Sequence, residues 1–293
     1  MSYLLNSVNI STYGITPGHA SGSNISLSGC YSMPKRSGKC FHSWDEYDSI
    51  EPYTETSEIF FAGRDIIFTG SIFGTVPVIT AYLKLLYDAI DAFSDLITFA
   101  TPYGSFSVLV KSITPRMING AASIEIVFRE LVVTLSGTIP AVSDSNYTID
   151  GRPFSSYGLY LSKAEALHDL PEMKEQFFTQ YGSEGYKITN RQNKTLDFNG
   201  FIIGSSLADF QSKVSALYKC FSSSGTRNIK INNEINIDCF DTEGFIIDNI
   251  LINGEVIANF KASLVCYSVN YLNYLLTEAG EYILTESDEY ILI

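Results

Sequence analysis

One short pattern occurs twice in this chain of 293 residues, and the repetition limits what the chain can fold into. The sequence Phe-x-Gly-x-Ile-x-Gly spans residues 68–74 and again residues 198–204, which lie 130 residues apart. Two further matches occur in the same order in both halves: residues 11–15 with 155–159, and residues 33–35 with 170–174. Three matches in one order are typical of an internal duplication, so we predict two copies of one domain.

The repeated pattern is carried by eight residues: Phe68, Gly70, Ile72, Gly74, Phe198, Gly200, Ile202 and Gly204. Within each set the residues are two apart, which places them on one face of a β-strand. Glycine inside a strand marks a bulge, a bend or the close approach of another backbone. A face that mixes bulky side chains with glycines suits a strongly coiled sheet that closes into a barrel. We therefore expect these residues to shape the fold and not to carry out chemistry.

An amphipathic helix is predicted after each of these strands. Its apolar positions are Tyr82, Leu86, Ala89, Phe93 and Leu96 in the first half, and Leu207, Phe210, Val214, Leu217 and Phe221 in the second. Ser206 is placed to cap the second helix, and Gly225 follows its end. The chain then returns to strands at 105–113, 123–133, 227–231, 235–240, 245–252 and 256–269, with a hairpin turn at Asn253–Gly254. The predicted fold class is mainly β with one α-helix per domain (α+β), as two tandem β-barrel or β-sandwich domains.

The domain boundaries follow from this repeat and from the segment that joins the halves. Residues 131–146 contain Ser-Gly, Pro and Ser-Asp-Ser, which are typical of a turn-rich linker. We predict a first β domain at 1–140, a second at 146–271, and an acidic C-terminal arm or hairpin at 272–293. Residues 276–293 contain a repeated octad, with five acidic residues and no basic one. This arm is either a solvated edge strand or a segment that docks on a neighbouring subunit.

Composition restricts the classes of partner. Charged residues make up 17% of the chain, below the roughly 25% usual for a soluble domain, and the net charge is −13. Like charges repel, so a protein that reads a DNA sequence is disfavoured. Little charge together with 19 Tyr and 19 Phe predicts that part of the surface is buried in an oligomer. We expect no signal peptide, and the apolar stretch at 79–99 contains Lys84 and three aspartates, which argues against a membrane anchor.

Strong catalytic, cofactor-binding and metal-binding motifs are missing from the sequence. The only Gly-Lys pair, Gly38–Lys39, lacks the earlier glycine of a phosphate-binding loop. Cys30, Cys40 and His42 have a spacing that matches no common zinc site, so inert thiols are the favoured interpretation. We predict no catalytic residue, no cofactor and no metal.

Two clusters of charged residues each permit a functional interpretation as well as that of a plain surface loop. Acidic residues close to Trp44 are Asp45, Glu46, Asp48 and Glu51. They could form the paired carboxylates of a glycosidase, but a solvated loop is favoured. Lys35, Arg36 and Lys39 form the one tight basic cluster. It fits a phosphate or an acidic neighbouring surface, and a plain surface loop is favoured over both.

The organisation of the chain resembles a known class of virus protein. A strand-rich domain with an amphipathic helix after a long strand, and then returning hairpins, resembles the tail-tube-type domain of tailed bacteriophages. Its tandem duplication resembles distal tail and tail hub proteins, over residues 11–270. The stretch 194–222 is similar to the strand-to-helix segment near the start of distal tail proteins. The helix-bearing unit occurs here in both halves, which departs from a simple distal tail pattern and leaves trimer and hexamer open.

The resemblance implies a structural virion protein without an enzymatic activity. Its copies would form a homo-oligomeric ring, a trimer or a hexamer, that joins the tail tube to tip or receptor-binding proteins of the baseplate. DNA would pass through the lumen as cargo without sequence-specific binding. The implied location is the virion tail, with assembly in the cytoplasm of the host bacterium. The alternative is a carbohydrate- or receptor-binding β-module of a phage or cell-surface assembly, with Trp44, Tyr47 and Tyr53 as its platform.

Overall fold

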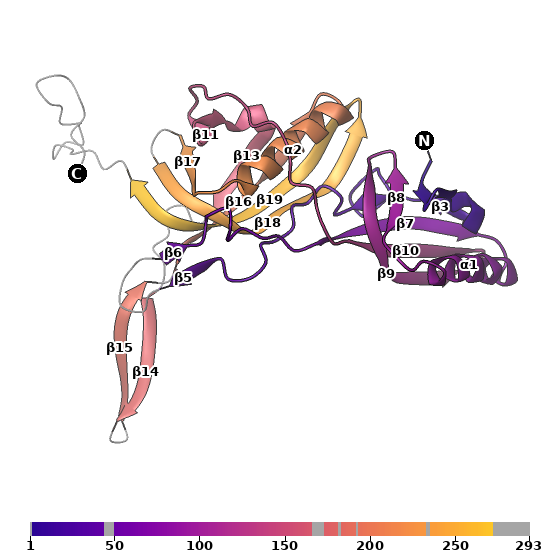
Figure 1. Ribbon diagram of the computed structural model, residues 1–293, viewed down its shortest axis with the longest axis horizontal. Helices are drawn as coiled ribbons and strands as arrows, with labels where there is room; N and C mark the ends of the chain where they lie inside the picture. Colours follow the sequence, from indigo (N-terminus) through magenta and orange to yellow (C-terminus); the bar gives the residue numbers. More distant parts are fainter. Residues whose placement is uncertain are drawn as a thin grey trace, which may run out of the picture.

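A computed structural model describes residues 2–43, 50–165, 173–180, 183–191, 193–232 and 235–271 of the chain. The fold is mainly β, as predicted, and Figure 1 shows strongly curved sheets with one α-helix beside each. These helices are α1 (Val76–Asp91) and α2 (Leu207–Ser222). None of the helices in the described ranges is both long and apolar enough to span a bilayer.

The first sheet is built from the N-terminal part of the chain, and its strands pair antiparallel. In spatial order they are β2 (Val8–Asn9), β1 (Leu4–Leu5), β8 (Ile97–Thr101), β9 (Gly104–Ile118), β10 (Ala121–Glu130), β7 (Arg64–Phe73) and β3 (Ile15–Pro17). The short strand β4 (Leu27–Ser28) also pairs with β7.

The second sheet has the same strand order. It runs β12 (Arg152–Pro153), β11 (Tyr147–Ile149), β17 (Arg227–Ile231), β18 (Ile235–Asn253), β19 (Glu255–Tyr271), β16 (Thr195–Gly204) and β13 (Leu159–Glu165). Two separate hairpins are β5 (Phe41–Ser43) with β6 (Ile50–Pro52), and β14 (Met173–Gln180) with β15 (Ser183–Arg191). The β14–β15 hairpin projects away from both sheets (Figure 1).

The register and the turns repeat together with the strand order. Ile15 of β3 pairs with Ile72, and Leu159 of β13 pairs with the equivalent Ile202. Before these strands lie the 3-10 turns η1 (Ile10–Tyr13) and η2 (Phe154–Tyr157), and each ends at a glycine in the left-handed region. The matches at 11–15 and 155–159 therefore occupy equivalent positions. The domain boundaries at 140, 146 and 271 stay a prediction.

The helices follow the sequence signals closely in one half and less closely in the other. Ser206 caps α2 as predicted, because its Oγ accepts a hydrogen bond from the Asp209 N–H at 3.2 Å. Helix α1 ends at Asp91, so Phe93 and Leu96 lie beyond it, although their spacing continues the helical pattern. Strand β8 begins at Ile97, and the chain must turn before that residue to enter the sheet.

Two of the predicted strands in the second half are one strand. β18 runs without a break from Ile235 to Asn253, and its register shifts between Asp241 and Phe245 and again between Asp248 and Leu251. These bulges bend the strand and do not end it. The predicted turn follows at Gly254, whose φ is +79°.

Buried residues of both sheets form one continuous hydrophobic cluster. In the first sheet, Phe99 stacks on Phe128 with ring centroids 4.4 Å apart. In the second, Phe245 lies 5.5 Å from Tyr218 of α2 and 5.4 Å from Phe260 of β19. Because the cluster crosses from one sheet to the other through α2, the contact between the halves is part of the core.

Candidate assembly surface

The eight residues of the repeated pattern lie in two separate sets, one along β7 and one along β16. Phe68, Ile72, Phe198 and Ile202 are buried. A Cβ added at Gly200 would lie 2.3 Å from the carbonyl oxygen of Tyr160, so this glycine permits β13 to approach β16. Gly74 lies just after β7 with φ +145°, and it begins the connection to α1. The part of these positions in closing the sheet stays a prediction.

Metal binding and thiol chemistry find no support in the part of the chain that the structure describes. No group of three or more His, Cys, Asp or Glu side chains there could hold a metal ion. Cys30 is a buried free thiol, and burial raises its pKa to about 12. A thiol with so high a pKa is a poor nucleophile at neutral pH. The acidic residues Asp45, Glu46 and Asp48, with Trp44 and Tyr47, lie outside the described residues.

The basic cluster differs from the surface loop that its sequence predicts. Arg36 is buried, and its backbone N–H donates to the Thr242 carbonyl of β18 at 2.8 Å. Its guanidinium donates to the carbonyl oxygens of Tyr53 and Glu58. The surface-loop prediction is therefore wrong for Arg36, which fastens the first half of the chain to the second.

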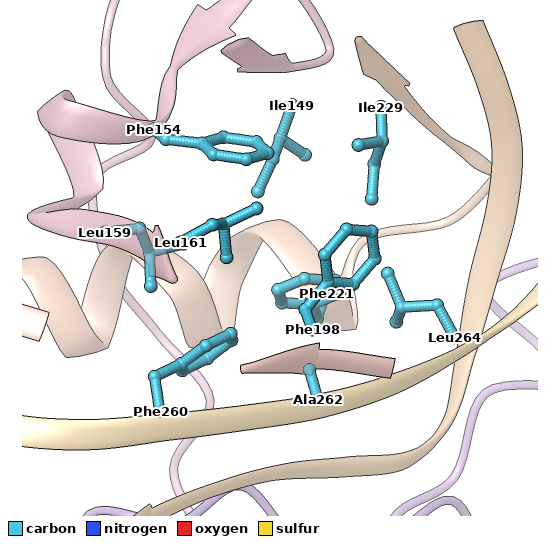
Figure 2. A pocket seen from close by; sticks show the side chains of 10 residues that line it. All are labelled: Ile149, Phe154, Leu159, Leu161, Phe198, Phe221, Ile229, Phe260, Ala262 and Leu264. Carbon is cyan, nitrogen blue, oxygen red and sulfur yellow. The ribbon is translucent and has the colours of Figure 1, made fainter. Parts of the chain in front are cut away.

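A small cavity lies inside the second sheet, and it is unsuited to a polar ligand. Figure 2 shows the ten apolar side chains that line it: Ile149, Phe154, Leu159, Leu161, Phe198, Phe221, Ile229, Phe260, Ala262 and Leu264. Its volume is about 10 Å³, which is barely enough for one water molecule. None of these side chains can donate or accept a hydrogen bond, so the cavity is a packing gap.

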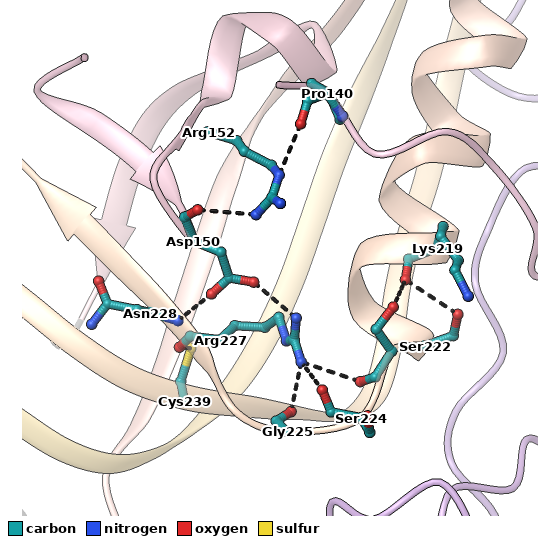
Figure 3. Close-up of polar contacts among 11 residues, drawn as sticks. Pro140, Asp150, Arg152, Lys219, Ser222, Ser224, Gly225, Arg227, Asn228 and Cys239 are labelled. Atoms are coloured by element: carbon teal, nitrogen blue, oxygen red, sulfur yellow. Dashed lines mark hydrogen bonds and ion pairs between the residues drawn. The ribbon is translucent and has the colours of Figure 1, made fainter. Parts of the chain in front are cut away.

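Charged groups near the end of α2 make ion pairs and hydrogen bonds that stabilise the fold. Arg227 pairs with Asp150 at 2.8 Å, and the other Asp150 oxygen accepts from the Asn228 N–H at 2.8 Å (Figure 3). Arg227 also donates to backbone carbonyls in the turn after α2, including Gly225 at 2.9 Å. Arg152 donates to the Pro140 carbonyl at 2.8 Å, which holds the linker against the second sheet. These bonds fix loops, so the charges serve the fold.

The outer face of α2 is covered by the first half of the chain. The Tyr218 hydroxyl donates to the Tyr31 carbonyl at 2.7 Å and accepts from Arg64 Nη1 at 2.7 Å. Gln211 donates to the Tyr103 carbonyl at 2.9 Å. Phe210 packs edge-to-face on Tyr31 with centroids 5.3 Å apart. Two polar side chains of α2, Tyr218 and Gln211, thus bond directly to groups of the first half.

Arg64 is the centre of this contact. Its Nε lies 2.7 Å from Glu130 Oε2, and both side chains are only 10% exposed. Its Nη1 also donates to the Ser32 carbonyl at 2.9 Å. A buried ion pair of this kind is costly to break, because the remaining partner would be a buried, unpaired charge. Burial raises the pKa of the neighbouring Tyr218 to about 12, which keeps its hydroxyl protonated as a donor.

A second seam joins residues 22–36 to the bulges of β18. The Met33 N–H donates to the Phe245 carbonyl at 2.8 Å, and the Asn24 N–H donates to the Ile250 carbonyl at 3.1 Å. A Cβ at Gly244, where φ is +71°, would lie 2.3 Å from the Met33 carbonyl oxygen. Only glycine fits this close approach without displacing the seam.

Helix α1 has no such cover among the described residues. Val76 is 64% exposed, Leu85 is 46% exposed and Tyr87 is 37% exposed. At the end of the first sheet where α1 begins, Phe73 and Ile118 are each 63% exposed. On α2, by contrast, no large hydrophobic side chain is exposed. Val76 with the neighbouring Phe73 and Ile118 forms the apolar part of the surface around α1, which we call the α1 face. Leu85 and Tyr87 lie on opposite sides of the exposed ion pair of Lys84 and Asp88.

Comparison with known proteins identifies no family for this chain. No family model matches the chain, and no curated protein matches it. Among solved structures, the crystal structure of the SPP1 Dit (gp 19.1) protein is similar over 92% of this chain and 98% of that chain. Its title describes that protein as a paradigm of the hub adsorption apparatus in phages that infect Gram-positive bacteria. The sequence identity is 12% and the TM-score is 0.35, which is too low to establish a common fold.

Proposed function

We propose that this chain is a structural protein of a bacteriophage tail, a distal tail or tail hub protein whose copies form a ring. The observation that carries the proposal is the repetition of one strand order with one helix in each half. Within the chain, α2 of the second half packs against the end of the first sheet where β7 begins, and α1 starts from the opposite end of β7. The halves are therefore stacked head to tail. A repeated unit stacked in this way has surfaces suited to further copies.

The mechanism of such a protein is self-assembly and docking. The ring would join the tail tube to tip or receptor-binding proteins, and it would have no catalytic step. Its lumen would let DNA pass, because a net charge of −13 repels the phosphate backbone and prevents adhesion. The protein would be a component of the virion tail, assembled in the host cytoplasm.

The proposal is tested by the mass and shape of the purified full chain. Light scattering after gel filtration is expected to give a trimer or a hexamer, and negative-stain images are expected to show a central hole. A chain that stays monomeric at every concentration and binds glycans would overturn the proposal and support the carbohydrate- or receptor-binding alternative.

Passage of DNA is tested separately by gel retardation of linear duplex DNA. We expect no retardation at micromolar protein and low salt, where electrostatic binding is strongest. Retardation that disappears as salt is raised would contradict an inert lumen, while it would leave ring formation untouched.

A further inference from the structure

The linker between the halves crosses α2 and lies directly on the backbone of that helix. A Cβ added at Gly137 would be 2.0 Å from the Ser215 carbonyl oxygen and 2.8 Å from the Ala216 nitrogen, so only glycine permits this approach. Two residues earlier in the linker, the Leu135 carbonyl accepts a hydrogen bond from Ser222 Oγ at 3.4 Å. The linker therefore covers α2 at its ninth and tenth residues, Ser215 and Ala216, and Ala216 is only 4% exposed.

A similar sequence follows the equivalent strand of the second sheet. β10 and β19 are both fifth in the strand order of their sheets. After β10, residues 132–137 read Val-Val-Thr-Leu-Ser-Gly, and after β19, residues 275–280 read Leu-Leu-Thr-Glu-Ala-Gly. Both contain two apolar residues, a threonine, a residue that differs, a small residue and a glycine. In the C-terminal arm, which lies outside the described residues, Gly280 thus has the place in the sequence that Gly137 has in the linker.

Helix α1 is open at the two positions that the linker covers on α2. Its fourth and eleventh residues, Ile79 and Leu86, are buried as their counterparts in α2 are, so both helices turn the same side toward their own sheet. Lys84 and Leu85 are the ninth and tenth residues of α1. Leu85 is 46% exposed, and the Lys84 side chain is 74% exposed although it pairs with Asp88 at 2.6 Å. In the part of the chain that the structure describes, this site on α1 is therefore uncovered.

The arm is too short to reach α1 of its own chain. Figure 1 shows α1 at one extremity of the molecule and the end of β19 toward the other, with the length of β19 between them. Gly280 is nine residues after Tyr271, the last residue of β19, and nine extended residues span at most about 32 Å. β19 alone has 17 residues and is longer than this. An arm that crosses α1 must therefore come from another copy.

We infer that the C-terminal arm of one copy of this chain crosses α1 of another copy at Lys84 and Leu85, as the linker crosses α2 within one chain. Gly280 would lie against the peptide that joins Lys84 to Leu85. The arm and α1 are different surfaces, and each copy has one of each, so the contact can continue from copy to copy and close into a ring. The inference rests on the proposed function and names a contact that would hold its ring together.

A charge difference in the arm is matched by a charge difference in the helix. Two residues before the glycine, the linker has Leu135 and the arm has Glu278. At the crossing point, α2 has Ser215 and α1 has Lys84, which is the only basic residue of α1. An ammonium group has three donors, so Lys84 can bind Glu278 and keep its bond to Asp88. Without this ammonium group the arm, with five acidic residues, would meet only carboxylates on α1.

An apolar contact is expected on the other side of the glycine. Two residues after it, the linker has Ile139, which is partly buried, and the arm has Tyr282. On the helices, Ala216 of α2 corresponds to Leu85 of α1. The tyrosine would cover the exposed leucine, so a larger pair of apolar side chains would replace the smaller pair of the linker contact.

Two neighbouring positions of the arm test the role of the glycine in the full chain. Gly280→Val is expected to raise the protein concentration needed for assembly by about tenfold or more, because its side chain would meet the backbone of α1. Ala279→Val is the matched control and is expected to assemble normally, since Ser136 at the same place in the linker is exposed. Light scattering over a dilution series measures assembly, and an unchanged urea midpoint of the dissociated chain shows intact folding. Equal behaviour of the two variants would overturn the inference.

Charge reversal tests the pairing of the arm with the helix. Lys84→Glu is expected to weaken assembly by about tenfold or more, and Glu278→Lys added to it is expected to restore most of the loss. Glu286→Lys occupies the corresponding place in the second octad and is expected to restore nothing. Equal rescue by the two lysines would reveal a general charge effect, and absence of rescue by Glu278→Lys would leave the arm unplaced; either result overturns the inference.

Cross-linking separates the possible occupants of α1. Leu85→Cys and Tyr282→Cys are made in separate chains, and a short bismaleimide is expected to give a covalent dimer only when the two are mixed. Wild type reports any background from Cys40, which is partly exposed. A dimer from Leu85→Cys alone would mean that another helix covers α1, and a link within one chain that carries both cysteines would mean that the arm covers its own helix; each overturns the inference.

The failure of this inference is distinguishable from the failure of the proposed function. If the wild type assembles into rings and the mixed variants give no covalent dimer, the placement of the arm fails and the proposed function stands. If the wild type stays monomeric at every concentration, the proposed function fails as well.

Discussion

Helices α1 and α2 follow equivalent strands in sheets of the same order, and they differ in what lies against their outer faces. Around α2, Tyr31, Tyr103 and Arg64 bond to Tyr218 and Gln211. Around α1, the Lys84–Asp88 ion pair and the apolar side chains of Val76, Leu85 and Tyr87 are exposed, without such cover among the described residues. The same strand-and-helix unit therefore occurs twice, and among the described residues only the helix of the second copy is covered by another part of the chain.

Part of this difference follows the usual relation between burial and polarity, because α1 carries the exposed ion pair of Lys84 and Asp88. A helix with an exposed outer face normally carries polar residues there. The tenth residue is Ala216 in α2 and Leu85 in α1, yet Ala216 is 4% exposed and Leu85 is 46% exposed. At this one position the larger apolar side chain is on the less covered helix.

The largest effect is expected when the cover of α2 is broken at Arg64. Arg64→Ala would leave Glu130 buried without its partner and remove a donor to Tyr218, so we predict a loss of about 3–5 kcal/mol of unfolding free energy. Urea denaturation followed by circular dichroism measures it. Lys111→Ala, which breaks an exposed ion pair with Asp65, is the control and should cost less than about 1 kcal/mol. Similar losses in both variants would contradict the central role of Arg64.

A pH-dependent effect is expected at the seam between the halves. Burial raises the pKa of Asp241 to about 7, against the Gly244 N–H and Arg36, which lower it, and one carboxyl oxygen has no hydrogen-bond partner. The unfolded pKa is near 4, so the folded state holds a proton between about pH 4 and pH 7 that the unfolded state releases. Stability from this group is therefore complete below pH 4 and is lost as the pH rises to 7, by on the order of 4 kcal/mol.

Asp241→Asn checks this assignment, because an amide does not titrate in that window. We expect the urea midpoint of the variant to vary less than that of wild type between about pH 4.5 and pH 7.5. An unchanged slope would show that other groups cause the pH dependence. Nothing equivalent is expected from substitutions on α1, where no described carboxyl is buried against a partner.

A smaller effect compares the two tyrosines themselves. Tyr218→Phe removes the bonds to Tyr31 and Arg64, so we predict a loss of about 1–2 kcal/mol. Tyr87→Phe removes an exposed hydroxyl and should change stability by less than about 0.5 kcal/mol. Thermal unfolding of the dissociated protein measures both. Equal effects would mean that the environments of the two helices in solution are alike.

The smallest effect on stability is expected from deletion of residues 276–293. The linker after β10 crosses α2, where Gly137 lies against the Ser215 carbonyl, and the C-terminal segment follows β19 at the equivalent place in the chain. We predict that the deletion leaves the unfolding midpoint unchanged and weakens assembly, as measured by light scattering over a dilution series. Unchanged assembly would favour a solvated edge strand over a docking arm.

Local signals were sufficient for several elements of the fold. The Ser206 cap, strand β17 and the turn at Gly254 lie where residue types alone predict them. The division of β18 into two strands was wrong, because bulges permit a strand to bend without ending. The surface loop at Arg36 was wrong because burial depends on what packs over a segment, and no local pattern reports it.

The exposed residues of α1 are part of the predicted helix, but the helical pattern does not tell them apart from the covered residues of α2. The connection from Gly204 to α2 is one residue longer than that from Gly74 to α1, so the two tyrosines correspond only when this extra residue is allowed for. No alignment of the halves can tell which tyrosine is covered. The covering groups, on Tyr31 and Arg64, are more than 150 residues from Tyr218 in the chain.

The order of residues along the chain was enough to establish a repeated, mainly β protein with a helix after each long strand, since strand and helix periodicities and turn residues act over a few neighbours. It was not enough to establish that α2 is buried and α1 is exposed. That difference arises because the first half of the chain folds over α2, whereas no described segment folds over the outer side of α1 in the same way. The covering contacts join residues that are far apart in the chain, and the periodicity of a local segment carries no information about such contacts.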